Sequence, residues 1–149
     1  MSLVLTAHGS TDPRASANTY AVAEQIRRDR PGLDVRVAFC EQSAPNLADV
    51  LTETPNAIVT PFLLADAYHA RVDIPAMIAD SGAVQADVLG EDHRLIAVLR
   101  ERVGELGVDP RQTDIGVIVV AVGSSRPAAN GRTTTVATAL ASGTCWAGA

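Results

Sequence analysis

The sequence predicts an α/β domain with a doubly wound parallel sheet and helices on both faces. Short apolar runs alternate with helical stretches over most of the 149 residues, which is typical of βαβ units. The chain is 47% hydrophobic but only 3% aromatic, so its core must consist of Val, Leu, Ile and Ala. Such a core suits buried parallel strands covered by helices.

The first part of the chain gives a signal for each element in turn. Leu3–Ala7 is a short apolar run and predicts a buried strand. A helix is expected from Asp12-Pro13, a capping residue followed by proline, to about Arg30. Leu33–Phe39 alternates apolar and polar residues as a strand does. Ala44–Thr52 has apolar residues on one helical face and predicts a short helix.

The same alternation continues in the second part. Ala57–Leu64 predicts a buried strand, and Arg71–Asp80 predicts a helix with a proline near its first turn. Val84–Leu89 is expected to be a strand. The helix that follows should be capped by Asp92 and end before a C-terminal glycine, Gly107. Ile115–Ala121 completes the series as another predicted strand.

The end of the sequence repeats its beginning. A shift of 114 positions overlays Leu3–Ile26 on Val117–Leu140 without a gap, and eight of the 24 positions are identical, starting with Ala7 on Ala121. We therefore predict a first domain over residues 1–108, a linker over 109–114, and the first βα unit of a second, similar domain over 115–149. On this interpretation the sequence is a fragment of a longer protein or a shortened form.

Composition narrows the classes of function. The formal net charge of −5 and the lack of a Lys/Arg cluster argue against a nucleic-acid partner. No apolar run approaches the roughly 20 residues that a membrane span needs, so no membrane association is expected. Two cysteines without a CxxC motif and the lack of a secretory signal favour the reducing cytoplasm.

Three side chains with metal-binding chemistry follow predicted strands. His8 follows Leu3–Ala7, Glu41 follows Leu33–Phe39, and His69 lies shortly after Ala57–Leu64. If these strands are neighbours, all three side chains lie at the carboxyl edge of the sheet, where open α/β sheets bind ligands. Two neutral imidazoles there could bind a metal, transfer a proton, or do both. Each residue alone also has a plainer interpretation as an ordinary loop residue.

Other polar residues surround this edge in the sequence. Ser10 could cap the next helix or donate to an anion, and Arg14 and Arg71, which each follow one of the histidines, could hold substrate carboxylates. A solvated helix residue is an equally good interpretation of either arginine. Asp73 could orient the His69 ring or cap the following helix, and capping is the expected role. Cys40 is expected to be a small buried residue, and His93 a surface residue.

Taken together, the motifs resemble a known family. The pattern His-Gly-Ser-x-Asp-Pro-Arg from His8, the acid Glu41, and Pro-x-x-Leu…His-x-x-x-Asp-Ile-Pro from Pro61 are similar to the sirohydrochlorin chelatases. These class II tetrapyrrole chelatases insert cobalt or iron in cobalamin or sirohaem biosynthesis. The resemblance covers about residues 3–107, and the repeat resembles the family's long, two-domain form. One departure is Ala67, where the family often has glycine two residues before the second histidine.

The resemblance implies a fold, an activity and a site. The fold would be a chelatase-like sheet, and the activity that of a lyase-type metal chelatase acting on a sirohydrochlorin-type tetrapyrrole. His8, His69 and Glu41 would be both the metal-binding and the catalytic residues. The divalent metal, Co²⁺ or Fe²⁺, would be a substrate, and no organic cofactor is implied. Both metals accept imidazole and carboxylate ligands, so the sequence does not choose between them.

Two other functions remain open from the residues. A histidine phosphatase would need Arg before the His-Gly pair, and this chain has Ala7 there. A protein that binds and delivers a metal or tetrapyrrole without insertion would use the same side chains. We also expect self-association, as a homodimer for example, because the strand Ile115–Ala121 would otherwise expose apolar surface.

Overall fold

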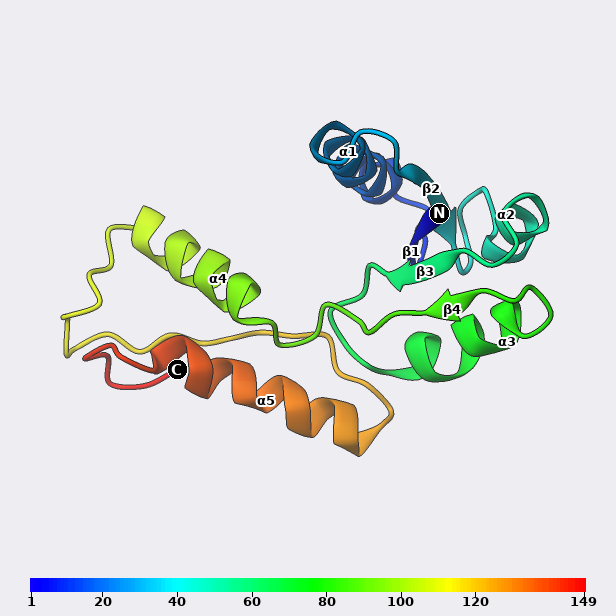
Figure 1. Cartoon of the computed structure of the whole chain (residues 1–149). Helices are drawn as coiled ribbons and strands as arrows, with labels where there is room; N and C mark the ends of the chain where they lie inside the picture. The colour runs from blue at the N-terminus through cyan, green and yellow to red at the C-terminus, as the bar shows by residue number, and fades with distance from the viewer. The chain divides into compact units, whose positions relative to one another are not determined.

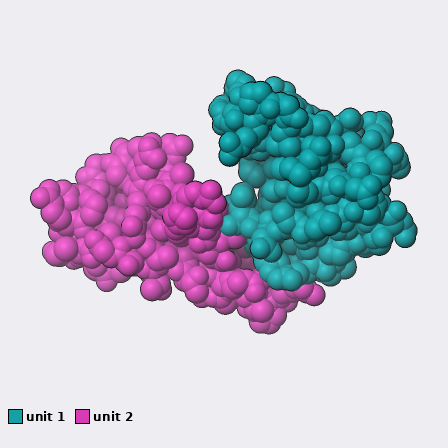
Figure 2. All heavy atoms as spheres, viewed as in Figure 1, with its two compact units in different colours: residues 1–89 teal, residues 90–149 magenta.

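The computed structural model describes residues 1–149, which form two units, Met1–Leu89 and Gly90–Ala149. Figure 2 shows the two units in different colours. The division places residues 90–108 with the second unit, whereas the sequence assigned them to the first domain. The predicted boundaries at 108 and 114 stay a prediction. No helix of the chain is both long enough and apolar enough to cross a membrane.

The first unit contains a four-stranded parallel sheet in the order β2-β1-β3-β4 (Figure 1). The strands are β1 (Ser2–Ala7), β2 (Asp34–Phe39), β3 (Ile58–Pro61) and β4 (Val84–Gln85). The predicted parallel sheet is thus confirmed. Strand β1 lies between β2 and β3, so the chain winds outward from β1 in both directions. The carboxyl end of β1 is therefore a topological switch point, where such sheets form their binding sites.

Helices cover both faces of this sheet, as predicted. Helix α1 (Pro13–Asp29) packs on one face over a cluster of buried residues: Leu5, Ala23, Val35, Val37 and Phe39. Helices α2 (Leu47–Glu53) and α3 (Ile74–Ile78) lie on the opposite face over a second cluster: Val4, Ala38, Cys40, Leu47, Val50, Leu51, Ala57, Val59 and Ile74. Alternate residues of β1 and β2 supply the two clusters, as the pleat requires.

Capping side chains determine where the first helices begin. The Asp12 carboxylate accepts a hydrogen bond from the Arg14 amide at 2.9 Å, so α1 starts at Pro13 as predicted. Helix α2 was expected from Ala44 but begins at Leu47. Its start is set by Asn46, whose side-chain oxygen accepts from the Ala48 amide at 2.9 Å.

The predicted helix Arg71–Asp80 begins earlier and in a different form. A π-helical turn, η1 (His69–Asp73), precedes α3, and the Ile74 amide donates to the carbonyl of His69, five residues back. Pro75 explains the wide turn. Proline lacks the amide hydrogen that an α-helix would need there, and its ring would clash with the carbonyl four residues earlier. The helix widens instead and then continues as α3 to Ile78.

The other differences concern strands. β3 and β4 are shorter than the expected Ala57–Leu64 and Val84–Leu89, although backbone bonds such as Leu89 N to Leu63 O continue their pairing. The predicted strand Ile115–Ala121 is wrong. Only a single parallel bridge forms there, between Gly116 and Gly148. No adjacent strand is present in the second unit to complete a ladder, and an isolated extended segment has no partner for its backbone groups.

The second unit consists of two packed helices, α4 (His93–Glu105) and α5 (Pro127–Ala141), with connecting segments. Arg100 of α4 fixes the C-terminal end of α5. Its guanidinium donates to the carbonyls of Leu140 at 3.1 Å, Ala139 at 2.7 Å and Ser142 at 2.5 Å. A cation at this end of a helix is favourable because the last carbonyls lack helical donors.

The two copies of the sequence repeat share the structure of their turn and of the helix that follows it. Helices α1 and α5 begin at equivalent prolines, Pro13 and Pro127. In both turns the serine hydroxyl accepts from the amide two residues on, at 3.0 Å for Ser10 and 3.1 Å for Ser124. The equivalent residues Thr19 and Thr133 each donate to the carbonyl four residues back at 3.1 Å. The repeat therefore preserves a turn and helix start as well as sequence.

Candidate metal centre

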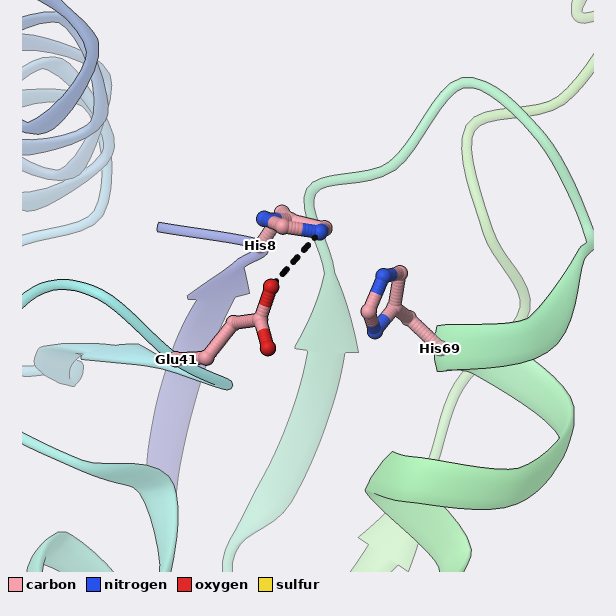
Figure 3. Close-up of side chains that lie close together, drawn as sticks. All are labelled: His8, Glu41 and His69. Carbon is pink, nitrogen blue, oxygen red and sulfur yellow. Dashed lines mark ion pairs between the residues drawn. The ribbon is translucent and has the colours of Figure 1, made fainter. Parts of the chain in front are cut away.

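His8, Glu41 and His69 lie together at the carboxyl edge of the sheet (Figure 3). They come from three elements, following β1, following β2 and starting η1. Their ligand atoms all lie within 4.8 Å of one another. The side chains are 38%, 50% and 28% exposed, so the group is reached from solvent yet is anchored by the sheet. The sequence predicted this set of three residues, and the structure brings them together.

The backbone holds Glu41 beside His8. The ladder between β1 and β2 continues past both strands, because the Glu41 amide donates to the His8 carbonyl at 2.9 Å. Gly9 permits this close approach. Its φ is +97°, and a Cβ at this position would lie 1.7 Å from the Glu41 carbonyl oxygen. Only glycine fits both the conformation and the space.

The hydrogen bonds of His8 determine which ring nitrogen faces the centre. Nδ1 lies 2.9 Å from the Gly9 carbonyl, which can only accept, so Nδ1 carries a hydrogen. In the neutral ring, Nε2 is then an unprotonated acceptor, and it lies 3.3 Å from Oε1 of Glu41 (Figure 3). A metal cation placed between these two acceptors would satisfy both of them.

His69 is oriented by Asp73. Oδ2 of Asp73 accepts from Nδ1 of His69 at 2.6 Å, which leaves Nε2 of His69 as the free acceptor. Metal-binding histidines are commonly held by a carboxylate in this way. The expected role of Asp73 as a helix cap is wrong, because its side chain makes no capping hydrogen bond. The π turn separates it from a normal helix start and brings its carboxylate to the ring.

The geometry fits one metal ion. The rings of His8 and His69 meet edge to face with their centroids 4.1 Å apart. Ligand atoms about 2.0–2.2 Å from a common metal lie roughly 3–4 Å from one another, so small side-chain movements would bring these three onto one ion. Two imidazoles and one carboxylate are ligands that Co²⁺ and Fe²⁺ accept. Three protein ligands leave further coordination positions open.

Removing the Asp73 carboxylate should weaken metal binding without unfolding the protein. In Asp73→Leu, the His69 ring loses its acceptor and its fixed orientation, so Co²⁺ affinity should fall about 10–100-fold. Isothermal titration with Co²⁺ measures this directly. Asp80→Asn changes an exposed carboxylate just beyond α3 and serves as the control. Unchanged affinity in Asp73→Leu, with both variants folded, would show that Asp73 does not position the ring.

The other predicted residues do not join this group. The Ser10 hydroxyl accepts from the Asp12 amide, and the Ser10 backbone exchanges hydrogen bonds with the Ser43 side chain at 3.0 and 2.9 Å. Arg14 is paired with Asp12, and Arg71 with Asp66. Each pair raises the arginine pKa above its ordinary value, chiefly through the side-chain hydrogen bonds. The substrate-binding roles of Ser10, Arg14 and Arg71 stay predictions.

The two remaining expectations are confirmed. Cys40 is buried, 4% exposed, and burial together with the nearby Asp73 and Glu41 carboxylates raises its thiol pKa to about 11. A thiol of this kind is unreactive at neutral pH. His93 is exposed at the start of α4. Sequence reasoning missed Ser43 and Gln85, which support the loops and η1 through tertiary hydrogen bonds that no local motif marks.

Comparison with known proteins identifies the family of this chain. A family model described as CbiX matches residues 2–106, more than half of the chain. The chain belongs to the CbiX family. The resemblance that the motifs carry is thereby confirmed, and the CbiX match covers all three residues of the candidate centre. It also spans β1 to α4, which includes helices on both faces of the sheet.

Relatives of this CbiX-family chain are named as sirohydrochlorin chelatases. It is 32% identical over 136 residues to a sirohydrochlorin ferrochelatase of Priestia megaterium, covering 81% of this chain but only 50% of that protein. A sirohydrochlorin cobaltochelatase of Methanothermobacter thermautotrophicus is 27% identical over 128 residues, covering 68% of this chain and 89% of that protein. The chain thus spans half the length of the ferrochelatase it matches.

A solved structure has the same fold. SirB from Bacillus subtilis with Fe³⁺ superposes with a TM-score of 0.80 at 22% sequence identity. The match covers 93% of this chain and 59% of SirB. At this level of identity the likeness establishes the α/β fold alone.

Proposed function

We propose that this protein inserts a divalent metal, cobalt or iron, into sirohydrochlorin or a closely similar tetrapyrrole. One observation carries the proposal: His8, Glu41 and His69 converge with two acceptor nitrogens and a carboxylate within 4.8 Å. Relatives named as sirohydrochlorin chelatases support the choice of substrate. The activity would be that of a lyase-type chelatase, with the metal as substrate and no organic cofactor.

The proposed chemistry requires a weakly held metal and an acceptor for two protons. Insertion breaks two pyrrole N–H bonds while the macrocycle nitrogens bind the metal, and two protons are released. Nε2 of His8, Nε2 of His69 and the Glu41 carboxylate would present the metal through three bonds and leave positions open for the macrocycle. When a protein ligand dissociates from the metal, its lone pair can accept a proton released by the pyrroles, since imidazole accepts protons near neutral pH.

Binding of the proposed substrate would depend on cationic side chains near the metal centre. Sirohydrochlorin-type tetrapyrroles carry carboxylate groups, and the formal net charge of −5 gives the chain no overall attraction for them. Local cations must therefore supply it. The side chain of Arg14 is 89% exposed and that of Arg71 is 59% exposed. Both guanidinium groups can therefore bind a carboxylate of the substrate, either beside their aspartate partners or in place of them. The Ser10 hydroxyl would donate a further hydrogen bond to a substrate carboxylate.

Anaerobic mixing tests the proposed activity. The protein is combined with sirohydrochlorin and either Co²⁺ or Fe²⁺, and the absorbance change on metal insertion is followed against the uncatalysed rate. Faster insertion with one or both metals is the expected result, and the ratio identifies the preferred metal. Because the chain spans half of one relative, a binding and delivery role is the second candidate. Binding of metal and tetrapyrrole without faster insertion would favour it over catalysis.

We also propose that the chain self-associates, as a homodimer for example. The extended segment after the linker exposes alternate apolar side chains, with Ile118 88%, Val120 90% and Val122 97% exposed. Its backbone forms only one bridge, so it offers a free strand edge as well as apolar surface. A second copy of the chain could pair with the free strand edge and cover the apolar surface.

The two cysteines are free, which agrees with the proposed cytoplasmic location.

Sedimentation velocity at tens of micromolar protein should therefore show a dimer or larger species. The double variant Ile118→Lys/Val120→Lys should shift the protein toward monomer, because it places charges where apolar contact is needed. Leu106→Lys is the matched control, since Leu106 is 83% exposed but lies outside the extended segment. A stable monomer in the unmodified protein, or equal dissociation by both variants, would contradict the proposal.

A further inference from the structure

The carbonyl of Ala70, inside η1, has no backbone donor from its own helix. In an α-helix its donor would be the Ile74 amide, but that amide donates to His69 instead. In a π-helix the donor would be residue 75, and Pro75 has no amide hydrogen. Ala70 is 2% exposed, so water does not readily reach this carbonyl. A buried carbonyl of this kind needs a partner from elsewhere.

Gln85 is that partner. Its Nε2 donates to the Ala70 carbonyl at 2.8 Å, across fifteen residues of sequence. Gln85 belongs to β4 and pairs in the sheet with Val59 of β3, which in turn pairs with β1. The side chain thus joins the π turn to the same sheet whose β1 and β2 carry His8 and Glu41.

We propose that Gln85 is a positioning residue for the metal centre, acting through the Ala70 carbonyl to hold the π turn that presents His69. The turn begins at His69 and ends at Asp73, so both the ligand and the carboxylate that orients it depend on its placement. His69 meets His8 at a centroid distance of 4.1 Å, and a displacement of about 1 Å would separate their ligand nitrogens enough to weaken joint binding. The inference rests on the proposed metal site.

The hydrogen bond from Gln85 stabilises the π turn in particular. The Oε1 atom of Gln85 is buried without a hydrogen-bond partner, which is unfavourable for folding. An apolar side chain of the same length would avoid that penalty in β4 but would leave the Ala70 carbonyl without a donor. The amide therefore stabilises η1, and π-helical turns are frequent at functional sites.

The test compares Gln85→Met with Thr54→Val. The first removes the donor while keeping the side-chain length. The second removes another buried side-chain bond to a backbone carbonyl, from the Thr54 hydroxyl to the Val50 carbonyl at 2.7 Å, which closes the end of α2 and does not involve η1. Two readouts are used: Co²⁺ affinity by titration calorimetry, and the imidazole ¹⁵N shifts of His69 in metal-free protein. Thermal unfolding shows how far each variant is destabilised.

Gln85→Met should bind Co²⁺ at least about 10-fold more weakly and should shift the His69 ring nitrogens, whereas Thr54→Val should lose stability but change neither. If Gln85→Met does not fold, Gln85→Asn, which keeps the amide one carbon too short to reach Ala70, should give the same shifts. Unchanged His69 shifts and affinity in a folded Gln85 variant, or equal changes in Thr54→Val, overturn the inference. Failure of the unmodified protein to bind Co²⁺ contradicts the proposed function instead, and the metal-free shifts still decide the role of Gln85.

Discussion

His8→Ala and His69→Ala should each lower the rate of metal insertion by about 10²–10⁴-fold while leaving the fold intact. Each variant removes a metal ligand and a proton acceptor at once, which is why the expected effect is so large. Neither side chain belongs to the buried core, and each is more than a quarter exposed, so the free energy of unfolding should change little. Absorbance during anaerobic insertion gives the rate, and circular dichroism reports on the fold.

His93→Ala is the matched control for both variants. His93 is the third histidine of the chain, is exposed, and lies at the start of α4 in the second unit. Its removal should leave the insertion rate unchanged. Near-normal turnover in folded His8→Ala or His69→Ala would remove that residue from the mechanism. A comparable loss in His93→Ala would mean that the assay responds to something other than the candidate centre.

Gly9→Ala should be the most destabilising single methyl addition near the site. The added Cβ would lie 1.7 Å from the Glu41 carbonyl oxygen, so the turn after β1 must move away from the turn after β2. Strain at positive φ adds about 1–2 kcal/mol, and with the clash the loss of unfolding free energy should exceed about 4 kcal/mol. Because His8 and Glu41 flank this contact, Co²⁺ binding should fall with it. Chemical denaturation and calorimetry measure the two losses.

Gly32→Ala separates the clash from the backbone strain. Gly32 has nearly the same backbone angle, φ +92°, but no atom lies within 4 Å of the position that a Cβ would occupy. This variant should lose only the strain of about 1–2 kcal/mol and bind Co²⁺ normally. If Gly9→Ala is no less stable than Gly32→Ala, the close approach of Gly9 to Glu41 does not hold the site together.

The residues of the candidate centre could be predicted because strand order makes them neighbours. His8, Glu41 and His69 each follow an apolar strand, and parallel strands place such residues at one edge. Supporting contacts could not be predicted in the same way. The bond from Gln85 to Ala70 depends on how β4 meets η1 in space, and nothing in the local sequence of either segment marks it.

Local rules failed where a competing interaction was stronger. Asp73 precedes Ile74-Pro75 and looks like a helix cap, but the π turn that Pro75 causes directs its carboxylate to His69. Ile115–Ala121 has the apolar character of a strand, yet a strand needs a continuous neighbour for its backbone groups, and only the short segment Ala147-Gly148 pairs with it. The alternation of elements in the first unit succeeded because each predicted strand there has a partner.

Calorimetry with Co²⁺ tests whether His8 and His69 bind the metal. Metal should bind at one specific site per chain, because the repeat places Val122 where the first copy has His8 and no histidine follows His93. Binding should disappear in the His8→Ala/His69→Ala double variant and be unchanged in Val122→Ala. A specific site that survives in the double variant would show that His8 and His69 are not the ligands of the metal.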